Sequence, residues 1–284
     1  EFRRVLFRSF PTQASLDGVH LHDDLLEDLS KSAIDAHVRA LAGFSRRLHQ
    51  IDPALLSATE RIEHPIVGAN IEGRMFEYET IGTWERNPQV YADAIGTSLA
   101  SQALFNYAPV PERARRVVSK LRQVPRLVQS ARENIKECPG IFVKIGLETW
   151  RGTLKFIESD LPRAFSSLDD LHILGDLADT STEAAAAIKS YIEYLENDLA
   201  PRAKASFRLG RDNFEQKLRH EEGTTLTADR LRITPAEVDA ALLQAQRGRE
   251  VHRPRLAHDH RLGHHAGLRI AVGAQGECVR AAPE

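Results

Sequence analysis

Five histidines lie close together near the carboxyl end of the sequence, within residues 252–265. Imidazole is the commonest metal ligand in proteins, and His260 and His264 have the spacing of two zinc ligands on one helical face. However, His260 is followed by Arg261, which would repel a metal ion and cannot act as a base, and Gly263 would weaken a helix. We therefore predict a His-rich tail without a zinc site.

Two other segments contain residue types that bind metals. His20, His22, Asp23 and Asp24 lie together, but no further ligands can be named for them, so we predict a solvated loop before the first helix. The His-Glu pair at 220–221 begins like a zincin motif, but no second histidine follows it, which predicts a plain helix end. The sequence therefore provides no catalytic, cofactor-binding or metal-binding residue.

Basic side chains are dense between residues 111 and 136, where a ridge of this kind could bind phosphates. Acidic residues share the segment, no aromatic residues interleave for base stacking, and the net charge of the chain is only −2. We predict a solvated helix face, and no nucleic-acid partner. The basic residues are Arg113, Arg115, Arg116, Lys120, Arg122, Arg126, Arg132 and Lys136.

The elements that carry these residues are expected to be helices. Apolar residues recur every three or four positions in several segments, and no segment alternates with period two. These patterns predict an all-α, irregular bundle of about seven or eight helices. No apolar run reaches the roughly 20 residues that cross a bilayer, so we expect no integral membrane segment. The apolar seams are Val117–Leu121–Val124–Val128–Ala131–Ile135, Val143–Leu147–Trp150–Leu154–Ile157–Leu161 and Ala184–Ile188–Tyr191–Leu195–Leu199.

Local signals predict where helices begin and bend. Capping boxes at residues 57–60 and 180–183 should each start a helix. The first of these helices should carry Ile62, Ile66 and Phe76 inward. A kink or break is expected there because Pro65, Gly68 and Gly73 weaken the helix. Pro125 should bend a single helix that spans residues 111–136.

The two ends of the sequence differ from its middle. Residues 1–9, EFRRVLFRS, resemble the translated end of a sequencing adapter, and they lack the apolar core of a signal peptide. After residue 231 the chain has no aromatic residue and no lysine. We therefore expect residues 1–9 to be an adapter artefact, residues 10–231 to be a helical domain part, and residues 232–284 to be a frameshifted or disordered tail.

Several stretches in order resemble the bacterial family called domain of unknown function 885 (DUF885), over about residues 16–231. The stretches are WERNPQVY at 84–91, PER at 111–113, LRQVPRL at 121–127, ARENI at 131–135 with Pro139, Gly152 with Phe156, DLP at 160–162, and Leu209-Gly210 with Phe214 and Leu218. The resemblance implies a mainly helical, zincin-like protein that hydrolyses peptides with zinc. Its metal motif, His-Glu followed by two residues and Pro-Gly-His-His, belongs to a carboxyl-terminal half that this chain lacks.

Residues 258–265 mimic that motif, with Asp259 in place of Glu and Leu262 in place of Pro. They follow Leu218 too soon, so the metal roles are not transferred to them. The resemblance thus implies an amino-terminal fragment of a zinc peptidase, with peptide substrate and zinc in the full-length parent and no activity of its own. The alternative is a complete, non-enzymatic helical scaffold or interaction module. Two lone cysteines, Cys138 and Cys278, fit a reducing, cytoplasmic location.

Overall fold

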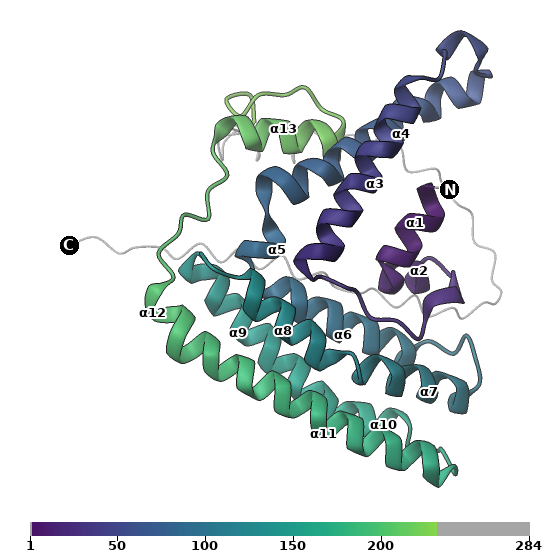
Figure 1. The fold of residues 1–284 in the computed structure, drawn as a ribbon, viewed down its shortest axis with the longest axis vertical. Helices are drawn as coiled ribbons and strands as arrows, with labels where there is room; N and C mark the ends of the chain where they lie inside the picture. The colour runs from purple at the N-terminus through teal and green to yellow at the C-terminus, as the bar shows by residue number, and fades with distance from the viewer. Residues whose placement is uncertain (1, 232–284) are drawn as a thin grey trace, which may run out of the picture. The chain divides into compact units, whose positions relative to one another are not determined.

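A computed structural model describes residues 2–231, so the predictions made for residues 232–284 lie outside the described residues. Every regular element in residues 2–231 is helical, apart from one isolated bridge between Pro139 and Lys204. The predicted all-α fold is confirmed. We call the elements of residues 2–81 the N-terminal layer and those of residues 89–199 the bundle (Figure 1).

The helices are shorter and more subdivided than predicted, with 3-10 or π-helical turns between several of them. The N-terminal layer contains α1 (Phe2–Ser9), α2 (Pro11–Leu16), η1 (His20–His22), α3 (Lys31–His49), η2 (Pro53–Leu55), α4 (Ala58–Phe76) and η3 (Glu77–Ile81). The bundle contains α6 (Gln89–Leu104), α7 (Val110–Leu121), α8 (Val124–Asn134), α9 (Gly140–Lys155), η4 (Phe156–Asp160), α10 (Leu161–Ala164), α11 (Leu171–Tyr194) and η5 (Leu195–Leu199). The remaining helices are α5 (Thr83–Arg86), α12 (Ala200–Arg202) and α13 (Arg211–Glu222).

The predicted apolar seams meet in one core inside the bundle. Val117, Val124, Trp150, Ile188 and Tyr191 are fully buried there. The Trp150 and Tyr191 rings pack edge to face with centroids 4.8 Å apart, a favourable aromatic geometry. Burial of this continuous surface is the main stabilising contribution to the bundle.

Two helix starts were predicted from capping boxes, and one prediction is wrong. Ser57 and Glu60 satisfy each other's backbone donors at the start of α4, as predicted. Thr180 instead lies within α11, which begins at Leu171 because the Asp170 carboxylate accepts the free N–H groups of the first turn. The Thr180 hydroxyl donates to the Asp176 carbonyl at 2.7 Å inside the helix.

Prolines and glycines had different effects from those expected. Pro125 does not bend one helix but occupies the first turn of α8, where its missing N–H costs little. Helix α4 continues through Pro65 without a break. Ile62 and Ile66, predicted to point inward, are 68% and 63% exposed because their part of α4 lies beyond the bundle, whereas Phe76 is buried as predicted.

The N-terminal layer contacts the bundle mainly through polar groups. Only Leu26 and Leu29 of the layer join the bundle core. The Asn134 side chain donates to the Leu29 carbonyl at 2.7 Å, and the side-chain amide oxygen of Gln123 accepts from the Leu26 N–H at 3.1 Å. These bonds connect α8 to the extended segment that precedes α3.

Candidate functional site

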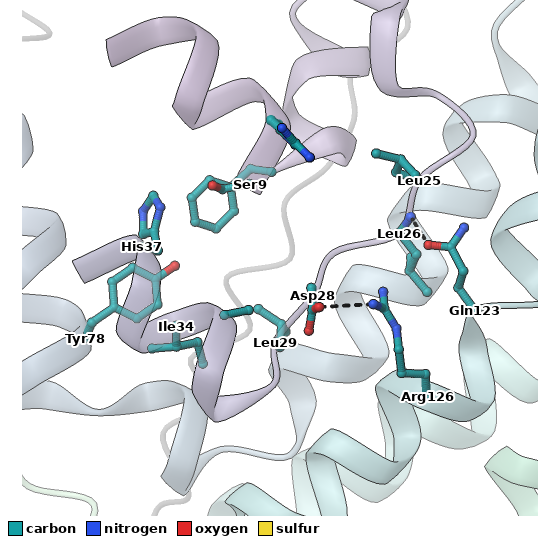
Figure 2. A pocket seen from close by; sticks show the side chains of 13 residues that line it. Ser9, Leu25, Leu26, Asp28, Leu29, Ile34, His37, Tyr78, Gln123 and Arg126 are labelled. Atoms are coloured by element: carbon teal, nitrogen blue, oxygen red, sulfur yellow. Dashed lines mark hydrogen bonds and ion pairs between the residues drawn. The ribbon is translucent and has the colours of Figure 1, made fainter. Parts of the chain in front are cut away.

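A cavity of about 370 Å³ lies between the segment before α3, helix α3 itself, η3 and α8. Figure 2 shows the rings of His37 and Tyr78 on one side of this cavity and the Asp28–Arg126 pair on the other. We call it the aromatic pocket. Asp28 and Arg126 form an ion pair at 3.0 Å, which fixes the segment to α8 at the polar side.

His37 is the titratable group of the aromatic pocket. It is buried, and neither of its ring nitrogens has a hydrogen-bond partner. The rings of Phe10 and Tyr78 contact it edge to face, at centroid distances of 5.1 and 5.5 Å. Burial, and secondly the positive charge of Arg74, lower the pKa of His37 to about 4. The imidazole is therefore neutral at physiological pH.

A second hollow of about 400 Å³ shares Phe10, Leu29 and Tyr78 with the aromatic pocket. Its walls come from α2, the end of α4, η3, α5 and α6, and they are mostly apolar. We call it the acidic hollow because three carboxylates line it. These are Glu27, Glu77 and Asp93, together with the single guanidinium of Arg74.

The three carboxylates differ in what neutralises them. Glu27 is buried and accepts two hydrogen bonds from Thr12, from the N–H at 2.9 Å and the hydroxyl at 2.8 Å. Glu77 accepts from the Thr83 hydroxyl and from Lys217 at 3.1 Å. Asp93 has no cationic partner among residues 2–231. Although its side chain reaches solvent, the surrounding walls desolvate it and raise its pKa, against a smaller effect of Gln89.

The backbone around the acidic hollow is unusual and holds the site in place. Glu77 and Tyr78 lie in a π-helical turn, which ends at Gly82 with φ +63°, a conformation that favours glycine. The Trp84 indole then donates to the Tyr78 carbonyl at 3.1 Å, and the Tyr91 hydroxyl donates to the Trp84 carbonyl at 2.6 Å. The stretch WERNPQVY, which supports the family resemblance, thus braces one wall of the hollow.

The prediction of a solvated loop before the first helix, at residues 20–24, is wrong for Asp23, and α1 and α2 precede this segment. This carboxylate is 1% exposed and contacts Ser15, His20 at 2.9 Å and Arg116 at 2.7 Å. Burial alone would raise the pKa of Asp23, but its hydrogen bonds, first that from Ser15, outweigh burial and lower it. A buried carboxylate needs such partners. Asp24 remains exposed, as predicted.

The predicted solvated basic face is also partly wrong. Arg113 and Lys120 are buried, and Arg113 donates to carbonyls at the end of α6 and in the loop after it, at 2.8 Å to that of Gln102 and at 3.0 Å to that of Ala108. Lys120 donates to the Ser98 hydroxyl at 2.7 Å, and burial lowers its pKa to about 8 although Glu27, Asp23 and Asp24 oppose this. Both cations therefore serve contacts between α7 and α6 inside the bundle.

The other predicted residues are placed as follows. His220 lies in the last turn of α13, as expected of a helix end, with its ring 5.6 Å from that of Phe76. The histidines of residues 252–265 lie outside the described residues. Within residues 2–231, no group of three His, Cys, Asp or Glu side chains is placed to hold a metal ion. No described helix is both long and apolar enough to cross a membrane.

Fold and site together define an all-α protein with a bundle core and a cavity system where a second helical layer meets it. The chain belongs to the family of bacterial proteins of unknown function DUF885, whose sequence profile matches residues 11–245. This confirms the family suggested by the sequence.

The fold is also similar to the solved structure of a candidate lipoprotein of unknown function from Shewanella oneidensis. The TM-score is 0.74 and the identity 20%, with 87% of this chain and 44% of that chain covered. The chain therefore spans less than half the length of that protein, and the likeness concerns the fold alone. No curated protein shows significant sequence similarity to the chain.

Proposed function

We propose that the N-terminal layer and α6 form a binding wall for peptide-like ligands that carry a positive charge. The observation that carries this proposal is Asp93, a carboxylate without a cationic partner among residues 2–231, in a hollow that is otherwise largely apolar. A partly desolvated carboxylate gains from a cation that enters beside it. Apolar contacts with Leu29 and Trp84 would hold the side chains of such a ligand.

For longer relatives we propose zinc-dependent peptide hydrolysis, as the family resemblance implies, with this wall as part of the substrate cleft. The described residues do not fit a zinc site, so no catalytic step is assigned to them, and we expect this chain alone to be inactive. A cytoplasmic location is also part of the proposal. Incubation of the purified chain with zinc and a mixed peptide library should give no hydrolysis, and clear turnover would contradict this assignment.

Binding can be measured through tryptophan fluorescence. The chain has two tryptophans: Trp150 is fully buried in the bundle, whereas Trp84 lines the acidic hollow. Titration with leucyl-phenylalaninamide should change the fluorescence of Trp84 in a saturable way. The N-acetylated form, in which a neutral amide replaces the charged amine, should bind at least about tenfold weaker, since tenfold corresponds to the roughly 1.4 kcal/mol of one charge-assisted contact.

Two variants assign the effect to the hollow. Asp93→Asn should reduce the affinity for the charged peptide to that for the acetylated peptide. Glu79→Gln is the matched control, because Glu79 is an exposed carboxylate of the neighbouring π-helical turn, Glu77–Ile81, and does not line the hollow. Equal affinity for the two peptides, or no fluorescence change at all, would refute the binding wall.

The scaffold alternative rests on the exposed apolar side chains of the α3–α4 hairpin. Leu55, Ile62 and Ile66 are more than 60% exposed, and clustered apolar exposure often marks a protein contact. A complete module predicts one sharp, reversible thermal transition of the purified chain. If the chain is instead a part that lacks its natural neighbours, its thermal transition should be broad and accompanied by aggregation. Replacement of Ile62 and Ile66 by serine should then reduce the aggregation.

A further inference from the structure

A third cavity, of about 240 Å³, lies beside the buried Asp23 and shares only Leu16 with the acidic hollow. Its polar wall includes His20, Gln102 and Tyr107, and Phe105 completes its apolar side together with Leu16. Both apolar side chains are partly exposed, at 45% for Leu16 and 49% for Phe105. The cavity thus combines a polar wall with an accessible apolar side, as small-molecule sites do.

Gln102 lines this cavity, and its side-chain amide nitrogen is unsatisfied. Its side chain is fully buried, its Oε1 atom accepts from the Tyr107 hydroxyl, and its Nε2 atom has no partner. If the amide were turned over, the carbonyl oxygen would take the unpaired position instead. A buried polar atom without a partner costs about 1–3 kcal/mol, so a ligand that pairs with this amide would recover that cost.

His20 provides a second oriented group. Its Nδ1 atom lies 2.9 Å from the Asp23 carboxylate, and its ring stacks on Tyr107 with centroids 3.9 Å apart. Arg116 holds the same carboxylate at 2.7 Å and donates to the Tyr107 hydroxyl at 3.1 Å. Because a carboxylate favours the proton on Nδ1, the Nε2 atom of a neutral His20 is left as an acceptor.

We propose that this cavity binds a small primary carboxamide that carries an apolar group. A primary carboxamide presents an acceptor and two N–H donors side by side, which matches the amide of Gln102 and the free acceptor of His20. Its apolar group would contact Leu16 and Phe105. The cavity is smaller than the roughly 300 Å³ at which drug-sized sites begin, which restricts the ligand to the size of a single ring or short chain.

Benzamide is a suitable probe, and ligand-observed NMR can measure its binding to the full chain. We expect saturable binding that is at least about tenfold tighter than that of N,N-dimethylbenzamide, which keeps the ring and the carbonyl but has no N–H donor. Gln102→Met, which preserves length but removes the amide, should weaken benzamide binding at least about fivefold. His20→Phe, which preserves stacking on Tyr107 but removes the acceptor, should do the same.

Gln129→Met is the matched control, because Gln129 is exposed on α8 and does not line the cavity; its affinity should equal that of the parent. If Gln102→Met fails to fold, as judged by circular dichroism, the His20→Phe result decides. Absence of saturable benzamide binding, equal binding of the dimethyl compound, or unchanged affinity in the folded variants would overturn the proposal. None of these outcomes depends on the acidic hollow, which is tested with charged peptides.

Discussion

The interior of the bundle and the contacts that attach the N-terminal layer to it are built by different interactions. The bundle has one continuous apolar core, from Tyr91 to Leu199, to which the layer adds only Leu26 and Leu29. The layer is held instead by an ion pair at Asp23 and by side-chain bonds to its backbone. Apolar burial is tolerant of local detail, whereas each buried polar contact fails if one partner is lost. The candidate cavities lie where these polar contacts attach the layer to the bundle.

The largest effect is expected from a substitution that opens a cavity in the bundle core, which tests whether apolar burial stabilises the bundle. Trp150 is fully buried, packs on Tyr191 and donates to the Pro88 carbonyl at 3.0 Å. We expect Trp150→Ala to lower the free energy of unfolding by about 4 kcal/mol, as measured by urea denaturation. Leu171→Ala is the control in the same bundle, because Leu171 is 81% exposed, and it should cost less than about 0.5 kcal/mol.

The layer should respond to acid before the bundle does. The unfolded chain protonates His37 near pH 6.5, whereas the folded imidazole takes up a proton only near pH 4. The contribution of the neutral imidazole to the free energy of unfolding is therefore fully present above pH 6.5. It is lost as the pH falls toward 4, by about 3 kcal/mol in total.

His37→Leu should remove this loss, and urea denaturation at pH 7, 5.5 and 4 measures it. His49→Leu, an exposed position at the end of the same helix, should keep the slope of the parent. If the two variants have the same slope between pH 6.5 and 4, His37 is not the group responsible.

The sequence predicted the bundle better than the layer, for a physical reason. A buried seam repeats every three or four residues, so Val117 to Ile135 or Ala184 to Leu199 can be read from the chain itself. The bond from Leu26 to Gln123 joins residues 97 positions apart, and that from Asn134 to Leu29 joins residues 105 apart. Such single polar contacts have no periodic signal, which is why Asp23 was expected in a solvated loop.

The candidate site shows the same limit. Asp93 looks like an ordinary polar position of a surface helix, and only the placement of α2 and η3 around it shows that its exposed carboxylate is partly desolvated. The family stretch WERNPQVY indicated the family in the sequence, and only the structure shows that its Trp84 lines this hollow.

The ion pair of Arg116 tests whether polar contacts hold the layer. Its side chain is 20% exposed and its partner Asp23 is 1% exposed, so Arg116→Met leaves a buried carboxylate without its cation. We expect the free energy of unfolding to fall by about 2 kcal/mol, with hydrogen exchange increasing in α2 more than in α9.

Arg122→Met is the control. It breaks a pair with Asp176 in which both partners are more than half exposed, and it should lower the free energy of unfolding by less than about 0.5 kcal/mol. Similar losses for the two variants would contradict a polar attachment.

The smallest expected effect is a gain in stability at the acidic hollow. The pKa of Asp93 is raised above 3.8 in the folded protein because the cavity walls desolvate its carboxylate. The charged form therefore destabilises the fold, and this cost develops as the pH rises through the raised pKa. Asp93→Asn should stabilise the protein at pH 7 by less than about 1 kcal/mol, since solvent still screens the group, and the gain should vanish below pH 3.8. Thermal denaturation across this pH range measures the gain in stability.

A variant that is less stable at pH 7 would mean that the charge of Asp93 is already stabilised by other groups in the folded protein. A cation entering the acidic hollow would then gain little from Asp93, which would contradict the proposed binding wall.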